Sequence, residues 1–275
     1  RHNRGAWLVR MEDLDRTREV PGAAGAILAT LEAFDLHWDG PVAYQSARTA
    51  AYAEAIERLQ GLGLIYPCGC SRSQIAAVAP VGLEGPIYPG TCRPGLPPGR
   101  TARSLRWRVP AGVVAFEDRV QGRLGQDVQG EIGDFVLRRA DGIHAYQLAV
   151  VVDDAWQAVS HVVRGADLAS STPRQILLQR CLGLPTPVYA HLPLVLDARG
   201  RKLSKSDAAA PVDAADPLPA ALQALRHLGQ PLPEETPANV AELWQWAIPA
   251  WDIARVPAGP SHVPGARPEP APSHR

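Results

Sequence analysis

Positive and negative charges cancel in this 275-residue sequence, methionine occurs once, and cysteine occurs only four times. A net charge of zero excludes a uniformly basic surface, so any contact with nucleic acid must come from local patches. Four unevenly spaced cysteines exclude the disulfide framework of a small secreted domain. No apolar run approaches the roughly 18 residues of a membrane-spanning helix, and no signal peptide is evident. These absences predict a protein of the reducing cytoplasm.

The remaining composition is that of an ordinary globular protein, with 46% hydrophobic and 20% charged residues. The length allows one large domain or two modest ones. The chain starts at Arg1 rather than at a methionine and enters an expected strand at Ala6. Because a domain seldom opens in a buried strand, we expect the N-terminus to be truncated.

A group of carboxylates follows the first expected strand, which spans Trp7 to Met11. The group consists of Glu12, Asp13 and Asp15. Ligands of open α/β sheets bind at the carboxyl ends of strands, where these side chains could hold a cation, an ammonium group or ribose hydroxyls. A solvated acidic turn is the alternative.

Two helices are expected next. The first begins at Pro21, because proline is favoured in the first turn of a helix, and the second follows Tyr44–Arg48 and stops near Gly61 and Gly63. Apolar side chains at helical spacing indicate packing in the core rather than a binding site. The side chains expected in the core are Ile27, Leu28, Leu31, Phe34, Ile56 and Leu59.

Three cysteines surround a loop rich in proline and glycine: Cys68, Cys70 and Cys92. Their thiolates could converge on one tetrahedral zinc ion. Three unconnected reduced thiols are the alternative, because no histidine nearby completes the ligand set. Tyr88 is the nearest candidate for a fourth ligand, and it would be an unusual one.

The middle of the chain is predicted to form strands. Leu105 to Val109 alternates arginines with apolar side chains, which indicates a half-buried strand with one basic face. That face could meet a phosphate backbone, or it could simply be solvated. Continuous apolar runs, typical of strands covered on both sides, follow further on. The other expected strands are Val113–Phe116, Asp134–Arg139, Tyr146–Val152 and His161–Gly165.

Arg164 lies where the last of these strands ends. A guanidinium group at that position can clasp a carboxylate with two hydrogen bonds. The alternative is an ion pair within the chain, with Asp153, Asp154 or Asp167 as the partner.

A loop with two lysines and two serines, Lys202–Ser206, follows the apolar run Leu192–Leu196. Its ammonium, hydroxyl and backbone N–H groups suit the polyphosphate of a nucleotide, and a solvated loop is the alternative. Helices are expected from Ser171, from Asp216 and from Val240. Beyond Val256 the chain is rich in proline and glycine, which predicts a disordered tail.

Five of these segments occur in the order found in class I glutamyl-tRNA synthetases, which the sequence resembles from about Gly5 to about Leu228. They are similar to that family's acidic strand end, its Gln-Ser-x-Arg helix start, two central segments and the lysine–serine signature loop. The segments are Val9–Asp15, Tyr44–Arg48, Tyr146–Asp154, His161–Gly165 and Lys202–Ser206.

Within that family the sequence is similar to the glutamyl-Q tRNA(Asp) synthetases, a short branch that places glutamate on the modified wobble base queuosine of tRNA-Asp. The arrangement of Cys68, Cys70, Tyr88 and Cys92 resembles the zinc site of that branch, including its tyrosine ligand. Only a pair of helices is expected after the signature loop, so we expect no large anticodon-binding domain in this sequence.

The resemblance implies an α/β fold: a Rossmann-like parallel sheet of the class I synthetase type, with a zinc-bearing insertion and a short helical C-terminal part. The implied divisions are 1–65 for the incomplete first half of the catalytic core, 66–130 for the insertion, 131–196 for the second half of the core, 197–255 for the signature loop and a helical stem-contact region, and 256–275 for the tail.

The resemblance also implies a monomeric, tRNA-modifying ligase that uses L-glutamate, ATP with Mg²⁺, queuosine-bearing tRNA-Asp and one structural zinc ion. Glu12 would hold the α-ammonium group, and Tyr146 and Arg164 would hold a substrate carboxylate. Catalysis would rest on positioning and electrostatic stabilisation, without a covalent enzyme intermediate. The implied ATP-binding residues are Lys202, Ser204 and Lys205, of which Lys205 is also catalytic.

One signature of the family has no counterpart in this sequence. Its His-rich motif should precede Gly5, so we expect the chain as given to be inactive or nearly so. Two other interpretations remain open. The chain could be a fragment of a glutamyl-tRNA synthetase that charges tRNA-Glu, or a non-catalytic relic that binds a nucleotide or RNA.

Overall fold

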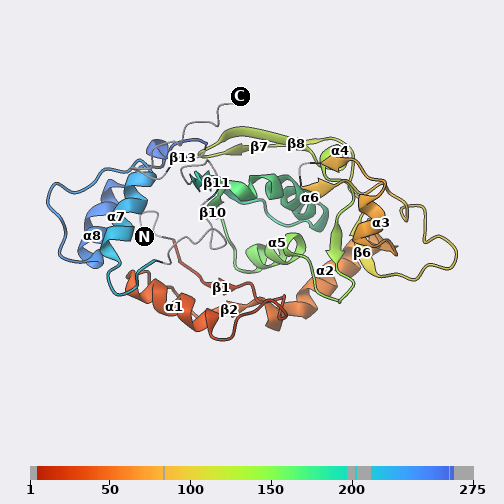
Figure 1. The fold of residues 1–275 in the computed structure, drawn as a ribbon, viewed down its shortest axis with the longest axis horizontal. Helices are drawn as coiled ribbons and strands as arrows, with labels where there is room; N and C mark the ends of the chain where they lie inside the picture. The colour runs from red at the N-terminus through yellow and green to blue at the C-terminus, as the bar shows by residue number, and fades with distance from the viewer. Residues whose placement is uncertain (1–4, 83, 197–201, 203–211, 260, 263–275) are drawn as a thin grey trace, which may run out of the picture.

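The computed structural model describes residues 5–82, 84–196, 202, 212–259 and 261–262. Figure 1 shows an elongated molecule with a strand-and-helix centre, a helical unit at one end and a small β-rich unit at the other. None of the helices in these described ranges is long and apolar enough to cross a membrane.

The central sheet has four strands in the order β10 (His161–Gly165), β11 (Val188–Leu192), β7 (Val113–Asp118) and β8 (Gly122–Asp127). Strands β10 and β11 are parallel, and helix α6 (Thr172–Leu182) makes the crossover that parallel strands need. Strands β7 and β8 form an antiparallel hairpin, and β7 meets β11 in parallel. This mixed architecture confirms the expected α/β class.

The main core contains residues of three helices, α2 (Thr49–Gly61), α5 (Tyr146–Trp156) and α6, together with residues of the central sheet and of segments 105–109 and 135–137. Ile56 and Leu59 of α2 are buried in it, as the helical spacing predicted. Helix α2 follows a short 3₁₀ helix, η1 (Gln45–Arg48), and ends at Gly61, where the sequence predicted a stop. The predicted strands 113–116 and 161–165 lie within β7 and β10.

The sequence predicted a strand at Tyr146–Val152, and this prediction is wrong. The segment forms the first two turns of α5. Four consecutive apolar side chains, Leu148 to Val151, are buried there between neighbouring helices. A helix that is buried on all sides shows no amphipathic period, so its sequence resembles that of a buried strand. Tertiary packing here outweighs the β-propensity of three consecutive valines.

The N-terminal part also differs from the prediction. Strand β1 covers only Arg10–Met11, paired with β2 (Ala43–Tyr44), while Trp7 and Leu8 are more than 40% exposed. Helix α1 (Ala23–Ala33) starts after Gly22 and has no buried residue. Ile27 is 51% exposed, whereas Leu28, Leu31 and Phe34 are partly buried and Phe34 packs against an apolar cluster. The predicted core face of this helix is therefore confirmed only in part. Helical spacing identifies an apolar stripe but cannot say how much structure covers it.

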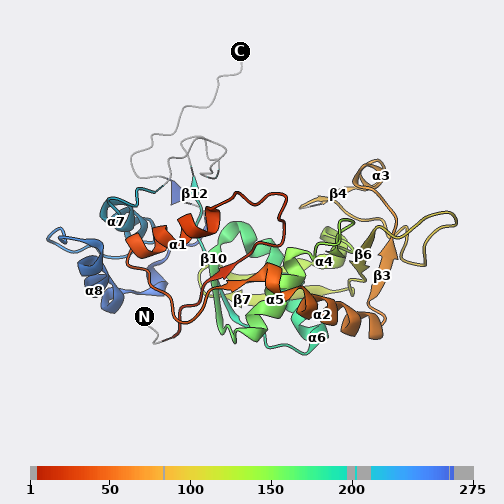
Figure 2. The same ribbon diagram turned by 90° about the horizontal axis from the view of Figure 1, so that it is seen from below.

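The β-rich unit contains the antiparallel sheet β3 (Ile65–Cys68), β6 (Ser104–Trp107) and β9 (Val136–Arg138). Figure 2 shows β3 and β6 side by side at this end of the molecule. We call residues 65–107 the cysteine unit. Besides β3 and β6 it contains α3 (Arg72–Ala76) and the hairpin of β4 (Val81–Gly82) and β5 (Gly85–Pro86). Helix α4 (Val128–Glu131) lies close by in Figure 1. Strand β9 is shorter than the predicted strand 134–139.

The prediction that β6 has one exposed basic face is wrong. The side chain of Arg106 is buried and donates to the backbone oxygen of Asp134 at 2.6 Å. Its guanidinium also lies 3.9 Å from the ring centroid of Tyr88. Because this side chain is only 8% exposed and packs against Tyr88 and Asp134, it cannot meet a phosphate backbone.

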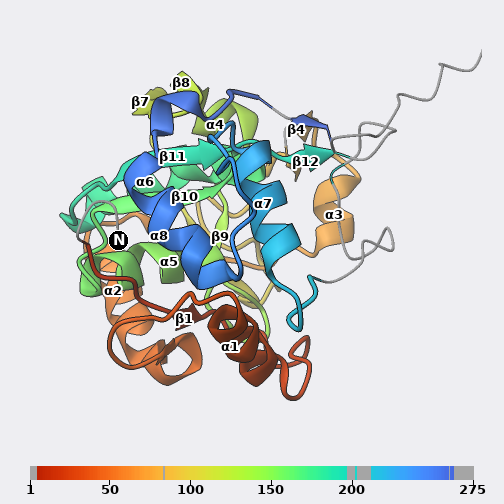
Figure 3. The same cartoon turned by 90° about the vertical axis from the view of Figure 1, so that its left-hand side faces the viewer.

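The opposite end of the molecule, which faces the viewer in Figure 3, is a helical pair, α7 (Leu218–His227) and α8 (Val240–Ala250), as the sequence predicted. The indole N–H of Trp244 donates to the backbone oxygen of Phe34 at 2.7 Å and joins this pair to the end of α1. The apolar run 192–196 is split at Pro193, which lacks an N–H group, and its last two residues form β12 (Val195–Leu196). Strand β12 pairs with β13 (Ser261–His262).

The predicted disordered tail does not begin at Val256. Val256 is buried after the 3₁₀ turn η4 (Ile253–Arg255), and Ser261–His262 forms strand β13. The remainder of the predicted tail, residues 263–275, lies outside the described residues.

Candidate active site and cysteine cluster

Arg164 lies at the carboxyl end of β10, directly beside His191 of the parallel strand β11. Its Nη2 donates to Thr172 Oγ1 and to Gln175 Oε1, both at 2.8 Å, and these residues belong to α6. Its Nη1 donates to the Tyr146 hydroxyl at 3.2 Å, and its Nε faces His191 Nε2 at 3.2 Å. These contacts use four of the five guanidinium N–H groups and leave one on Nη1.

No carboxylate forms an ion pair with Arg164 in the described part of the chain, so the internal ion pair that was the alternative hypothesis is wrong. Each of the three candidate aspartates has a different partner. Asp153 pairs with Arg48, Asp154 with Arg10, and Asp167 with Lys202. A half-buried guanidinium group whose hydrogen bonds all go to neutral acceptors has no carboxylate in direct contact among the described residues, and it therefore suits an anionic ligand.

A fully buried carboxylate–imidazole pair lies behind Arg164. Asp118 Oδ2 and His191 Nδ1 are 2.6 Å apart, and neither side chain is accessible to solvent. Burial would raise the pKa of Asp118, but hydrogen bonds from the Gln121, His191 and Val120 backbones and from the His191 ring hold it below its usual value. Burial lowers the pKa of His191, so the ring is neutral near pH 7.

Glu12 lies just beyond β1, and its side chain is 41% exposed. Its carboxylate is 3.4 Å from Arg10 Nη2, and the same guanidinium group pairs with Asp154 at 2.9 Å. Removal of surrounding water raises the pKa of both Glu12 and Asp154, and each is raised further by Asp153. This crowding of carboxylates would be relieved by an additional cation.

Tyr146 lies within the electrostatic influence of both Arg164 and Glu12. Burial raises the pKa of its hydroxyl, the charge on Arg164 opposes that rise, and the charge on Glu12 adds to it. Both charged groups therefore act on one phenol, which places Glu12, Tyr146 and Arg164 in the same region.

The other acidic residues after β1 are structural. Asp13 accepts hydrogen bonds from the backbone N–H of Ser46 at 2.9 Å and from its hydroxyl at 2.5 Å. Asp15 accepts from Arg139 at 2.7 Å. Of the three carboxylates after β1, Asp13 and Asp15 are therefore used within the protein, and Glu12 is the one available to a ligand.

The Gln-Ser-x-Arg segment, Gln45–Arg48, donates hydrogen bonds to a buried carboxylate of α5. Gln45, Arg48 and Tyr52 all donate to the carboxylate of Asp153, at 3.0, 2.7 and 2.7 Å. Asp153 is wholly buried, so these three donors replace its lost water. The guanidinium group of Arg48 also lies 3.6 Å from the ring centroid of Trp156.

The lysine–serine loop is described only at Lys202. Its ammonium group pairs with Asp167 of the 3₁₀ helix η2 (Ala166–Ser171), next to β10. The remaining predicted ATP ligands of this loop, Ser204 and Lys205, lie outside the described residues.

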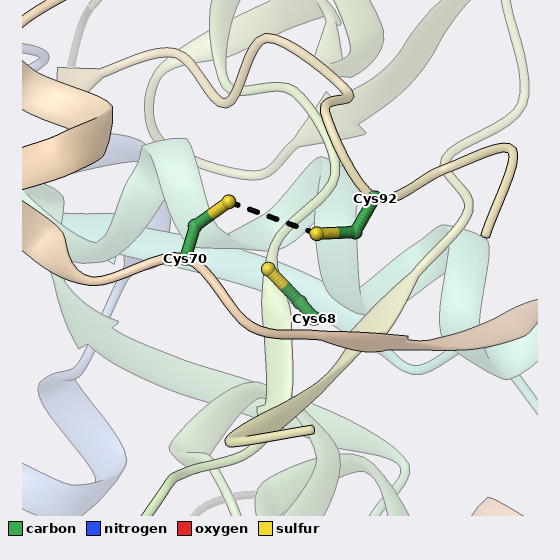
Figure 4. A group of neighbouring side chains, drawn as sticks. All are labelled: Cys68, Cys70 and Cys92. Carbon is green, nitrogen blue, oxygen red and sulfur yellow. Dashed lines mark hydrogen bonds between the residues drawn. The ribbon is translucent and has the colours of Figure 1, made fainter. Parts of the chain in front are cut away.

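The three cysteines of the cysteine unit converge, as the zinc hypothesis requires. Their sulfur atoms all lie within 4.8 Å of one another (Figure 4), and the Cys70 and Cys92 sulfurs are 3.7 Å apart. The Tyr88 hydroxyl lies 3.4 Å from the Cys68 sulfur and 3.8 Å from the Cys70 sulfur. This cluster could hold a metal ion, with three soft sulfur ligands and one phenol oxygen.

The electrostatic surroundings favour a thiolate at Cys68. Burial works against ionisation, but hydrogen bonds from Tyr88, the Cys70 backbone and Arg106 lower the pKa of Cys68 to about 7. Arg106 Nε lies 3.3 Å from the sulfur. Because a metal ligand must be deprotonated, the buried arginine helps to prepare the cluster for a cation.

Sequence reasoning missed the residues that surround Arg164: Asp118, His191, Thr172 and Gln175. His191 was detectable in principle, because it lies near the carboxyl end of a second strand, Val188–Leu192, and the carboxyl ends of parallel strands meet at one edge. Asp118 was not detectable, because β7 lies far from β11 in the sequence and forms a hairpin with β8.

The family model for "tRNA synthetases class I (E and Q), catalytic domain" matches residues 1–81 and 97–236. The chain therefore belongs to this family of class I tRNA synthetases, which confirms the resemblance seen in the sequence. Among its relatives, the glutamyl-Q tRNA(Asp) synthetase of Dechloromonas aromatica is 56% identical over 256 residues, covering 92% of this chain and 85% of that protein. The one from Chromobacterium violaceum is 52% identical over 260 residues, covering 94% and 87%.

Two solved structures share the fold. A glutamate tRNA ligase from Elizabethkingia meningosepticum, in complex with its amino acid, matches with a TM-score of 0.77 at 22% identity. A glutamate-tRNA synthetase from Elizabethkingia anophelis matches with a TM-score of 0.78, also at 22% identity. The matches cover 95% and 96% of this chain but only 61% and 62% of those proteins. At this identity the likeness concerns the fold alone.

Proposed function

We propose that the protein activates L-glutamate with ATP and transfers it to the queuosine wobble base of tRNA-Asp. Its family and the names of its relatives support this activity. The observation that carries the proposal is Arg164, a half-buried cation with a free N–H group beside Tyr146 and no carboxylate partner among the described residues.

The side-chain carboxylate of glutamate would bind to Arg164 and Tyr146. The free Nη1–H and the phenol O–H can each donate to one carboxylate oxygen, which differs from the two-N–H clasp that the sequence predicted. The α-ammonium group would bind near Glu12, where the crowded carboxylates gain from an added positive charge. This orientation leaves the α-carboxylate free to react.

The reaction would have two steps. An oxygen of the α-carboxylate attacks the α-phosphorus of ATP, and pyrophosphate leaves. A hydroxyl of queuosine then attacks the acyl carbon, loses its proton, and AMP leaves. Mg²⁺ and the lysines of the signature loop, Lys202 and Lys205, would offset phosphate charge, with no covalent enzyme intermediate.

We further propose that the cysteine cluster binds one structural zinc ion through Cys68, Cys70, Cys92 and Tyr88. Zinc prefers four such ligands in tetrahedral arrangement, and a closed set without water stabilises structure rather than chemistry. Three free thiols require a reducing compartment, which suits the cytoplasm.

The activity can be tested with radiolabelled glutamate, ATP, Mg²⁺ and the protein expressed from its complete gene. We expect labelling of tRNA-Asp from cells that make queuosine and none of tRNA-Asp from cells that lack it. Labelling of tRNA-Glu instead would favour an ordinary glutamyl-tRNA synthetase, and the absence of any glutamate-dependent labelling would favour a binding relic. The variant Arg164→Lys should lose most activity, whereas Arg123→Lys on the exposed β8 should not.

A further inference from the structure

We propose that Asp118 and His191 are positioning residues that hold the Arg164 guanidinium in the orientation that receives the substrate carboxylate. The inference rests on the proposed function, because it concerns how the same arginine meets glutamate. It adds two residues that touch neither glutamate nor ATP.

The three side chains form a chain of contacts across three neighbouring strands. Asp118 ends β7, His191 lies in β11 and Arg164 lies in β10. From Asp118 Oδ2 to His191 Nδ1 the distance is 2.6 Å, and from His191 Nε2 to Arg164 Nε it is 3.2 Å. His191 has no solvent-accessible surface, so water cannot replace either contact.

The hydrogen bonds of Asp118 determine which nitrogen of His191 carries the proton. Its other oxygen, Oδ1, accepts from the backbone N–H groups of Val120, Gln121 and His191 at 2.9 to 3.1 Å, which fixes the carboxylate in place. A carboxylate only accepts, so the proton of the neutral ring lies on Nδ1. Nε2 then presents a lone pair to Arg164.

That lone pair determines what Arg164 can do. Nε2 accepts from the Arg164 Nε–H and, at 3.1 Å, from the Thr172 hydroxyl. The two N–H groups of Arg164 Nη2 in turn donate hydrogen bonds to Thr172 and Gln175. Two edges of the planar guanidinium are therefore occupied by the protein, and only the Nη1 edge, beside Tyr146, faces the substrate.

The substitution Asp118→Asn separates positioning from folding. The side-chain oxygen of asparagine can keep all three backbone hydrogen bonds, because they all end on Oδ1. Its amide nitrogen then takes the place of Oδ2 and donates to Nδ1. This forces the proton onto Nε2, where it points at the N–H group of Arg164, donor against donor.

We expect Asp118→Asn to raise the KM for glutamate by about tenfold or more, because a charged hydrogen bond is lost behind the binding group. The kcat and the KM for ATP should stay within about threefold, since the arginine contacts glutamate equally in the ground and transition states. Nitrogen-15 NMR should show the His191 proton moving from Nδ1 to Nε2. A shifted proton with an unchanged KM for glutamate would overturn the inference.

His191 offers a graded series. In His191→Gln the side-chain oxygen can still accept from Arg164, so much of the affinity for glutamate should return, whereas His191→Leu should lose it. The exposed His161→Gln, three residues before Arg164 on β10, is the matched control and should behave like the wild type. Equal KM values for His191→Gln and a folded His191→Leu would count against positioning. If His191→Leu does not fold, the comparison of Asp118→Asn with His191→Gln decides.

Failure of the proposed function would give a different result from failure of the positioning role. In that case the wild-type protein itself would show no glutamate-dependent labelling and no glutamate binding by calorimetry. A wild-type protein that is active, beside an Asp118→Asn variant with a normal KM, would reject only the positioning role.

Discussion

At the scale of single residues, the site depends on which polar groups are buried together. Arg164 and Tyr146 were expected from the resemblance, and the structure joins them at 3.2 Å. The neighbours that hold the arginine came from α6, β7 and β11, which are separate in sequence. Residue types therefore indicated the charge that meets the substrate, while the surroundings that orient it required the fold.

The buried His191 should make the protein less stable in acid. Its pKa in the folded state lies below the ordinary value of 6.5 for histidine, because burial and Arg164 lower it more than Asp118 and Asp167 raise it. The unfolded chain therefore binds the proton more readily, so the contribution of His191 is complete above pH 6.5 and is lost as the pH falls through the folded-state pKa.

Urea unfolding of the wild type and of His191→Gln between pH 8 and pH 5 measures this contribution. The difference in free energy of unfolding should shrink as the pH falls, and other titrating groups cancel in the comparison. A difference that grows toward acid pH would contradict the neutral, buried state of the ring.

At the scale of elements, α5 shows how tertiary contacts decide between helix and strand. Its apolar run fits either structure, and packing against α2 and α6 selects the helix. The helix also places Asp153 toward Gln45, Arg48 and Tyr52. The motif that resembled a family helix start thus stabilises a buried carboxylate and, through it, the helix that begins with Tyr146.

Replacement of Asp153 by alanine should destabilise the fold by about 3 kcal/mol, because it leaves a largely buried arginine and two other donors without their acceptor. Asp141→Ala is the matched control. It removes an aspartate that also pairs with an arginine, at a site 47% exposed, and should cost less than about 1 kcal/mol. Chemical denaturation of the two variants checks both values, and equal losses would show that the Asp153 network contributes little.

At the scale of the whole molecule, the cysteine unit has a small apolar cluster of its own. That cluster contains Tyr66, Cys68, Ile75, Tyr88 and Cys92, and it is separate from the main core. So small an apolar cluster gives limited stability, which is why a metal ion would matter there.

Removal of the metal by a chelator should therefore unfold the region around Cys68, Cys70 and Cys92 before the main core. We expect one zinc ion per chain by elemental analysis, its loss in Cys92→Ser, and its retention in Cys181→Ser, where the thiol lies in α6 outside the cluster. Hydrogen exchange should rise first in residues 68–92, because Leu105 and Trp107 of β6 belong to the main core. Uniform protection after complete loss of zinc would contradict a structural role.

Residue type and spacing along the chain by themselves predicted the core face of α2 and offered convergence of the three cysteines as one of two alternatives. The family, and with it the α/β class and the charged groups of the site, was predicted from the resemblance of five ordered segments to class I glutamyl-tRNA synthetases. Only the tertiary structure decided that residues 146–156 form a helix, that Arg106 is buried, and that Asp118 and His191 lie behind Arg164. Those outcomes depend on which surfaces cover one another, and that depends on contacts between residues far apart in the chain.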